Sequence, residues 1–329
     1  MPKPVNTTKA TALDVRAALK EAIARLRAAH VASHTLAAEL LLMHALACDR
    51  TWLYTNPETP IDPGVVREYF ALVARRASGE PTQYLTGKQE FWGLDFEVTP
   101  AVLIPRPETE HVIEVALERL GPRGIKIDMA TGAPNPELRV ADVGTGSGCL
   151  AVAFAHELPH AEITATDISA AALDVARRNA VRHSVLDRIH FVHTNLLDAC
   201  IDDALLTHYP PAIPDQKSGI TRHRWQPFDL IVSNPPYVAR TEAGTLAREV
   251  RDHEPHAALF GGPAGTEIYS RLIEQAGELL RAGGILVLEL GHNSADEVRK
   301  MLDVQPRWAN VSITSDLAGI PRVLAAIRI

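Results

Sequence analysis

Several features that would assign the chain to other protein classes are scarce or absent. Its 329 residues include three cysteines, Cys48, Cys149 and Cys200. Their number and spacing offer neither a disulfide framework nor a Cys-x-x-Cys metal site, so we expect small buried thiols. No apolar run approaches a membrane span, and residues 1–10 do not resemble a signal peptide, which favours a cytoplasmic protein. A basic excess is also lacking: the formal net charge of −7 disfavours broad electrostatic attraction to nucleic acid.

The length and composition are typical of a globular chain with more than one domain. With 46% hydrophobic and 22% charged residues, 329 residues suffice for two domains or one large domain with an extension. Apolar residues recur at helical spacing through residues 12–78, and Pro81 ends this region. Residues 89–98 then alternate like a short hairpin. We predict a helical domain at 1–80, a β-hairpin linker at 81–105 and a second domain at 106–329.

From Leu138 onward the pattern alternates between strands and helices. The expected strands in this alternation are residues 139–143, 162–166, 189–193, 228–233 and 285–290. Such alternation predicts an α/β fold, with a mostly parallel sheet covered on both faces. The last two expected strands, 311–314 and 323–329, are joined by a connection too short for a helix, which predicts an antiparallel hairpin at the sheet edge. Residues 121–137 and 207–226 are expected to be surface excursions.

A glycine-rich turn follows the first expected strand of this region. Gly144, Gly146 and Gly148 would let the backbone approach a ligand, although glycines at such turns also serve plain packing. Their spacing lacks the third glycine position of a dinucleotide fold, and no phosphate-binding lysine is present. Asp167 ends the next strand, where a carboxylate can accept both hydroxyls of a ribose. The turn and Asp167 therefore favour a nucleoside-bearing cofactor. The glycine spacing favours S-adenosylmethionine over a dinucleotide.

The tetrapeptide Asn234-Pro235-Pro236-Tyr237 follows the apolar strand at 228–233. Because each proline fixes its φ and removes an N–H, the carbonyls of Asn234 and Pro235 would form a rigid patch of acceptors. The amide oxygen of Asn234 and the flat ring of Tyr237 suit a planar group that carries N–H donors, such as an amide or an exocyclic amine. All four residues are candidate substrate-binding residues, and Asn234, Pro235 and Tyr237 are candidate catalytic residues.

The combination of these motifs resembles a known family. The order of the glycine turn, Asp167 and Asn-Pro-Pro-Tyr resembles the class I S-adenosylmethionine-dependent methyltransferases that modify amino groups on planar substrates. Further segments are similar to the HemK/PrmC family of peptide chain release factor glutamine methyltransferases, namely residues 84–87, 91–93, 103–110, 253–255 and 316–319. The resemblance runs from Tyr84 to the C-terminus, and the helical domain also fits the N-terminal domain of that family.

The resemblance implies a fold, a cofactor and a partner. The fold would be Rossmann-like, with a mostly parallel seven-stranded sheet, a C-terminal antiparallel hairpin and a small N-terminal helical domain that docks the protein substrate. S-adenosylmethionine would be the methyl donor for N5-methylation of the glutamine in the Gly-Gly-Gln motif of class I release factors, which act in translation termination. No metal is expected. The expected cofactor-binding residues are Gly144, Thr145, Gly146, Ser147, Gly148, Asp167, Ile168, Asn195, Leu196 and Asn234.

Some residues depart from the family pattern or have weaker assignments. Asn195-Leu196 stand where the family often has an aspartate and an aromatic residue, so leucine would pack on the base without stacking. By resemblance, Arg106 and Glu110 are expected near the methionine end of the cofactor or at the domain interface. Glu289 ends an expected buried strand near the same sheet edge, so it is expected to help shape the site. Lone histidines such as His253 and His292 are weaker candidates for a base.

Other functions stay open on the sequence alone. Asn-Pro-Pro-Tyr is shared with adenine N6-methyltransferases, against which stand the net charge and the lack of an evident nucleic-acid-binding module. Ribosomal protein glutamine methyltransferases share the chemistry but differ at residues 106–110. A non-catalytic S-adenosylmethionine-binding protein is a further hypothesis, against which stands the intact tetrapeptide. We expect no stable nucleic-acid partner and no membrane, and the sequence leaves the oligomeric state open.

Overall fold

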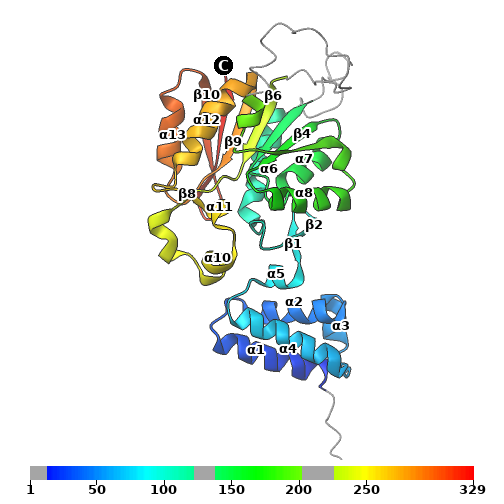
Figure 1. Ribbon diagram of the computed structural model, residues 1–329. Helices are drawn as coiled ribbons and strands as arrows, with labels where there is room; N and C mark the ends of the chain where they lie inside the picture. The colour runs from blue at the N-terminus through cyan, green and yellow to red at the C-terminus, as the bar shows by residue number, and fades with distance from the viewer. Residues whose placement is uncertain (1–12, 122–137, 202–225) are drawn as a thin grey trace, which may run out of the picture. The chain divides into compact units, whose positions relative to one another are not determined.

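The computed structural model describes residues 13–121, 138–201 and 226–329 (Figure 1). Contacts divide the chain into two compact units, one comprising residues up to Gly87 together with Ala247–His253, the other beginning at Lys88 and comprising the rest. The two predicted surface excursions lie almost entirely outside the described residues. Within the described ranges, no helix combines the length and apolar character that crossing a membrane requires.

The first unit is a helical bundle, as the sequence predicts. Its helices are α1 (Val15–Ala28), α2 (His34–Leu46), α3 (Arg50–Thr55), α4 (Pro63–Ala77), α5 (Thr82–Thr86) and α10 (Arg248–His253). Asp14 and Asp62 start α1 and α4, each with a side-chain oxygen 2.7 Å from a first-turn N–H, which satisfies donors that the helix cannot pair internally. Arg76 of α4 forms an ion pair with Glu249, which attaches the distant α10 to this unit.

The second unit is built on a seven-stranded sheet in the order β10-β11-β9-β6-β3-β4-β5. Its strands are β3 (Arg139–Val143), β4 (Glu162–Asp167), β5 (Ile189–His193), β6 (Phe228–Ser233), β9 (Leu280–Glu289), β10 (Trp308–Ser315) and β11 (Pro321–Arg328). The strands from β9 to β5 in this order pair in parallel, whereas β11 is antiparallel to both β9 and β10. The predicted mostly parallel sheet with a C-terminal hairpin at its edge is confirmed.

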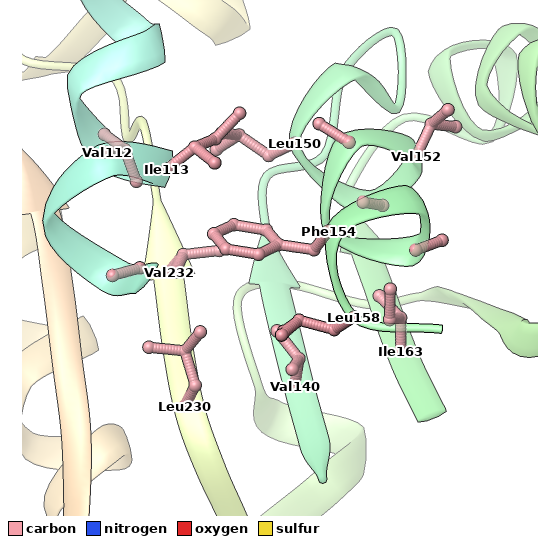
Figure 2. Close-up of a cluster of buried hydrophobic side chains, with 14 of the residues drawn as sticks. Val112, Ile113, Val140, Leu150, Val152, Phe154, Leu158, Ile163, Leu230 and Val232 are labelled. Atoms are coloured by element: carbon pink, nitrogen blue, oxygen red, sulfur yellow. The ribbon is translucent and has the colours of Figure 1, made fainter. Parts of the chain in front are cut away.

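Helices cover both faces of this sheet because successive residues of its buried strands point to opposite sides. The described helices of this unit, not all of which lie on the sheet, are η1 (Pro107–Thr109), α6 (Glu110–Leu120), α7 (Cys149–Glu157), α8 (Ala170–Arg182), η3 (Leu186–Arg188), η4 (Arg240–Thr245), α11 (His256–Leu259), α12 (Glu267–Leu279) and α13 (Ala295–Asp303). Val140 and Val232 face a core with α6 and α7, while Ile231 faces α12 and α13. Figure 2 shows the Phe154 ring of α7 extending over the sheet toward Val232. Burial on both faces fixes the strand ends that carry the site.

Two small strand pairs complete this unit. The predicted hairpin is β1 (Lys88–Phe91) with β2 (Leu94–Glu97), and it turns at Trp92 and Gly93, whose positive φ angles of 55° and 71° suit a two-residue turn. A second pair, β7 (Val238–Ala239) with β8 (Phe260–Gly262), is parallel. The sequence analysis missed this pair because two or three residues are too few to reveal an alternating pattern.

Candidate functional site

The glycine turn lies at the carboxyl end of β3, where open α/β sheets bind ligands. Gly144, Gly146 and Gly148 have φ angles of 74°, 55° and 81°, in the left-handed region that side chains disfavour. The N–H of Gly144 donates to the carbonyl of Thr166 at 2.9 Å, which ties the turn to β4. A Cβ on Gly148 would lie 3.0 Å from the Cβ of Ala176, so this glycine also allows α8 to pack closely.

A cavity of about 240 Å³ opens beside this turn. Of the predicted site residues, its lining includes Gly144, Gly146, Asp167, Ile168, Asn195, Leu196, Asn234 and Pro236. One carboxylate oxygen of Asp167 accepts the N–H of Ser169 at 2.8 Å and the other accepts that of Gly146 at 2.9 Å. Each oxygen retains a lone pair for a ligand hydroxyl. Ile168 is 58% exposed, so this large apolar side chain is available to cover a flat ligand ring.

A smaller cavity of about 40 Å³ adjoins the same turn and is lined by Asp142, Thr145, Ser147 and Asn234 among others. One oxygen of Asp142 accepts the hydroxyl of Thr145 at 2.6 Å and the N–H of Ala151 at 3.1 Å. Its other oxygen and the Ser147 hydroxyl are buried without a hydrogen-bond partner. Burial raises the pKa of the Asp142 carboxyl to about 7. Since buried polar atoms are nearly always paired, these two atoms suit a ligand that brings N–H donors and positive charge.

Asp142 was not among the predicted site residues, although the sequence gives a signal. An aspartate in the last two residues of a buried strand, just before a glycine turn, is buried at the mouth of the sheet. Asp142 is indeed 1% exposed. A buried carboxylate needs a hydrogen-bond or ion-pair partner, either in the protein or in a ligand.

The Asn-Pro-Pro-Tyr tetrapeptide follows β6, and its Asn234 is joined through Thr109 to Glu289, two residues from distant elements. The side-chain Nδ2 of Asn234 donates to the hydroxyl oxygen of Thr109 at 3.0 Å. That hydroxyl donates to Oε2 of Glu289 at 2.6 Å. Thr109 ends η1 and Glu289 ends β9, so three separate elements meet at Asn234. Asn234 is also the predicted residue that links the two cavities to the tetrapeptide, because it lines both.

Three glycines hold the tetrapeptide in place. A Cβ on Gly261 would lie 2.4 Å from the carbonyl oxygen of Pro236, and one on Gly265 would lie 2.4 Å from that of Tyr237. A Cβ on Gly291 would lie 2.7 Å from Cδ2 of the Tyr237 ring, so the ring lies directly against this glycine. Such close approaches leave no room for a side chain. The backbone after β6 is therefore confined by its neighbours on several sides.

The remaining candidates lie outside the linings of these two cavities, namely Pro235, Tyr237, Gly148, Arg106, Glu110, Glu289, His253 and His292. Arg106 forms an ion pair with Glu254, which is 4% exposed and also accepts the N–H of Ile104 at 3.4 Å. Two segments that the sequence analysis quoted separately, 103–110 and 253–255, thus meet. Glu110 accepts the N–H of Trp92 at 2.8 Å and so fixes the hairpin turn. No cluster of three or more metal-ligating side chains occurs in the part of the chain that the structure describes.

Comparison with known proteins gives consistent matches over the whole chain. Residues 17–87 match the PrmC N-terminal domain, and residues 129–218 match the methyltransferase small domain. The chain is 42% identical over 312 residues to the release factor glutamine methyltransferase of Koribacter versatilis, covering 95% of this chain and 98% of that one. Identity to the proteins of the same name from Chlorobaculum tepidum and Nitratidesulfovibrio vulgaris is 41% over 309 residues and 38% over 328, with at least 94% of each chain covered. With its helical unit, its glycine turn and its Asn-Pro-Pro-Tyr strand end, the chain belongs to the release factor glutamine methyltransferase family.

Proposed function

We propose that this protein methylates the side-chain nitrogen, N5, of the glutamine in the Gly-Gly-Gln motif of class I peptide chain release factors. The observation that carries the proposal is the position of Asn234, which begins the tetrapeptide and lines both cavities beside the glycine turn. A planar amide held at Asn234 would therefore lie next to the cofactor. The names of the relatives point to the same substrate class. A cytoplasmic location follows from a substrate that acts in translation.

The methyl donor is S-adenosylmethionine, and the residues present fit it. We propose that Asp167 accepts the ribose hydroxyls while Ile168 and Leu196 pack on the base, because all three line the larger cavity. The unpaired buried oxygen of Asp142 and the Ser147 hydroxyl would hold the amino-acid end, which carries an ammonium group. When bound, the cofactor supplies an electrophilic methyl group on a positively charged sulfur.

The task of the protein is to make an amide nitrogen nucleophilic. Its lone pair is delocalised into the carbonyl, so the enzyme must favour a geometry in which that pair is localised. Acceptors at Asn234 Oδ1 and the Pro235 carbonyl would hold the two N–H bonds and aim the nitrogen at the methyl group. Transfer would replace the S–CH₃ bond with an N–CH₃ bond, and one N–H proton would then leave to water. A strong general base is not required, because the nitrogen becomes acidic only after transfer.

Tyr237 is proposed to support the tetrapeptide and to pack against the substrate amide. Its ring lies directly against Gly291, so its position is defined by close packing. Burial raises the pKa of its hydroxyl above the usual range, which keeps that hydroxyl neutral. Because a neutral phenol does not act as a base at physiological pH, the proposed role of Tyr237 is contact with the amide.

The helical unit, predicted at residues 1–80, is proposed to dock the protein substrate. Its surface carries a groove of about 620 Å³ whose lining includes apolar Leu19 and Ile23 and basic Arg16, Lys20 and Arg27. An apolar floor with basic groups suits an acidic, amphipathic segment of a partner. Lys20→Glu should raise KM for the release factor several-fold and leave kcat and cofactor affinity unchanged. An unchanged KM would place docking elsewhere.

A labelled-methyl assay tests the function directly. Purified protein, labelled S-adenosylmethionine and a class I release factor are combined, and a release factor with its Gly-Gly-Gln glutamine changed to alanine serves as control. Label on the wild-type factor alone supports both the reaction and the site. Label on neither factor would overturn the proposed substrate and direct the search to ribosomal proteins or nucleic acid. Cofactor binding without transfer to any of these would indicate a non-catalytic binding protein.

A further inference from the structure

We infer that Thr109 and Glu289 are positioning residues that decide which face of the Asn234 side-chain amide meets the substrate. The inference rests on the proposed function, since it concerns how the site receives a glutamine amide. An asparagine amide can present either an oxygen acceptor or an NH₂ donor, and the two differ by a half-turn about one bond. Only the oxygen can hold a substrate N–H. Some feature of the site must therefore select one orientation.

The selection follows from the direction of two hydrogen bonds. An ionised carboxylate only accepts, so the single hydroxyl hydrogen of Thr109 is donated to Glu289, at 2.6 Å. The hydroxyl oxygen of Thr109 can then only accept from Asn234, and it does so from Nδ2 at 3.0 Å. With Nδ2 committed to Thr109, Oδ1 is the atom left for the substrate. The carboxylate thus fixes the orientation of the Asn234 amide without touching that residue.

Burial stabilises these two hydrogen bonds. Thr109 and Glu289 are each 2% exposed, so bulk water does not compete for their hydrogen bonds. Ser233 of β6 pairs in parallel with Leu288 of β9, which places the next residue of each strand, Asn234 and Glu289, at the same sheet edge. Thr109 arrives from η1 to bridge them. Because these hydrogen bonds join residues of three separate elements, they depend on the tertiary fold and not on local sequence.

Protonation of Glu289 would reverse the direction of both hydrogen bonds. A neutral carboxyl group can donate its own proton to Thr109, whose hydroxyl hydrogen then turns to Asn234. The amide would rotate to accept it with Oδ1 and would present NH₂ to the donors of the substrate, which is repulsive. Burial raises the pKa of Glu289 to about 7, against the hydrogen bond from Thr109, which lowers it. The productive orientation is therefore favoured above neutral pH.

Other charged and titratable groups around Glu289 do not change this expectation. Those that influence its carboxyl, or are influenced by it, are Glu108, Arg106, Arg322, Tyr237, Tyr269 and Cys149. The arginines favour the ionised form and Glu108 opposes it. Burial raises the pKa of Cys149 to about 12 and those of both tyrosines above the usual range, so these three groups stay neutral between pH 6 and 8. The tyrosine hydroxyl of Tyr269 donates to the backbone carbonyl of Glu289 at 2.8 Å and leaves the carboxyl group itself free to titrate.

Steady-state kinetics with a conservative rescue tests the positioning role. At saturating cofactor, Thr109→Val should lower kcat about tenfold or more, because the amide loses its fixed orientation, while release-factor KM stays within about twofold. Thr109→Ser keeps the hydroxyl and should restore most of the rate. Thr266→Val is the matched control, since Thr266 is also a buried threonine 3.1 Å from a glutamate oxygen, that of Glu297. This control should retain the wild-type rate. A Thr109→Val rate within about twofold of wild type, or failure of serine to restore it, would overturn the inference.

Nuclear magnetic resonance of the Asn234 side-chain NH₂ provides a readout independent of turnover. The resonance is identified by its loss in Asn234→Ala, and in the wild type its shift should titrate near neutral pH. In Glu289→Gln the titration should vanish, together with the rise of wild-type kcat between pH 6 and 8. A pH-independent resonance in the wild type would refute the inference. If the release factor is not methylated at all, the proposed function fails, while the NMR titration still decides whether Glu289 controls the orientation of the Asn234 amide.

Discussion

The substitution Asp142→Asn should change the stability of the apo protein and its affinity for the cofactor in opposite directions. Burial raises the pKa of this carboxyl from 3.8 to about 7. Because the folded state holds the proton more tightly than the unfolded chain does, the resulting stability is fully present below pH 4 and is lost as the pH rises toward 7. At pH 8 the ionised carboxylate is a buried charge, and one of its oxygens has no partner. The apo protein therefore folds against a penalty at this position.

The size of this penalty sets the expected stability change. A difference of about three pKa units corresponds to about 4 kcal/mol at pH 8. Asparagine removes this charge penalty but places an NH₂ group where the unpaired oxygen lay, which costs about 1–3 kcal/mol if no partner is found. Asp142→Asn should therefore raise the free energy of unfolding of the apo protein at pH 8 by about 1–3 kcal/mol. Below pH 5 the advantage should disappear.

Cofactor affinity should change in the opposite direction. A hydrogen bond between a carboxylate and an ammonium group contributes about 1.5–3 kcal/mol, so its loss should weaken S-adenosylmethionine binding about tenfold to hundredfold. At the proposed contact the ammonium would favour ionised Asp142 in the wild type, so binding should release a proton and affinity should increase from pH 6 to pH 8. In Asp142→Asn this dependence should be absent. Calorimetry in buffers of different ionisation enthalpy measures both the affinity and the proton release.

A second buried aspartate serves as the matched control. Asp229 is paired with Arg281 and accepts the N–H of Arg139 at 2.8 Å. Asp229→Asn should therefore destabilise the protein at pH 8, opposite to the stabilisation expected of Asp142→Asn, and should leave cofactor affinity unchanged. Equal cofactor affinities of wild type and Asp142→Asn, or a less stable Asp142→Asn apo protein at pH 8, would refute the reasoning.

Two further substitutions probe the tetrapeptide. Asn234→Ala should leave cofactor affinity within about threefold but reduce methyl transfer at least about hundredfold, as measured by calorimetry and the labelled-methyl assay, and retained turnover would contradict the role proposed for Asn234. Gly261→Ala should lower kcat and cost about 1–3 kcal/mol of stability, because its Cβ would lie 2.4 Å from the backbone oxygen of Pro236. Denaturant titration checks the second change, and an unaltered rate and midpoint would show that the loop can move aside.

The sheet could be predicted because its strands are buried on both faces. Residues 228–233 form a fully buried strand, and such strands appear in sequence as continuous apolar runs. Where the sequence signal was short or mixed, the prediction was incomplete. β9 begins at Leu280 and not at Ile285: Leu280 pairs with Phe228 of β6, and the register then shifts before Ile285 pairs with Leu230. Gly283 and Gly284 lie in this irregular stretch and hide the strand from sequence patterns. α3 spans only Arg50–Thr55, too short for helical periodicity to appear.

The site could be predicted as a set of motifs but not as a set of contacts. Asn234 and Asp167 were recognisable because each ends an apolar strand. The hydrogen-bond network of Asn234 was not, since Thr109 lies 125 residues from Asn234 and 180 from Glu289. Local patterns determine the element to which a residue belongs, whereas sheet order and helix packing determine which element ends meet. The position of Glu289 at the end of a buried strand predicted that it lies near the site, and the fold adds its hydrogen bond with Thr109.

Asp142 and Glu289 are two buried carboxyls whose pKa values both lie near 7, and they lie near the carboxyl ends of β3 and β9, the strands on either side of β6. Their titrations should nevertheless separate in a pH profile. Asp142 lines the smaller cavity, so its ionisation should affect cofactor affinity. Glu289 contacts Thr109 and lines neither cavity, so its ionisation should affect kcat at saturating cofactor. A kcat limb that disappears in Asp142→Asn but persists in Glu289→Gln would reverse these two assignments, because the group that orients the substrate amide would then be the one beside the cofactor.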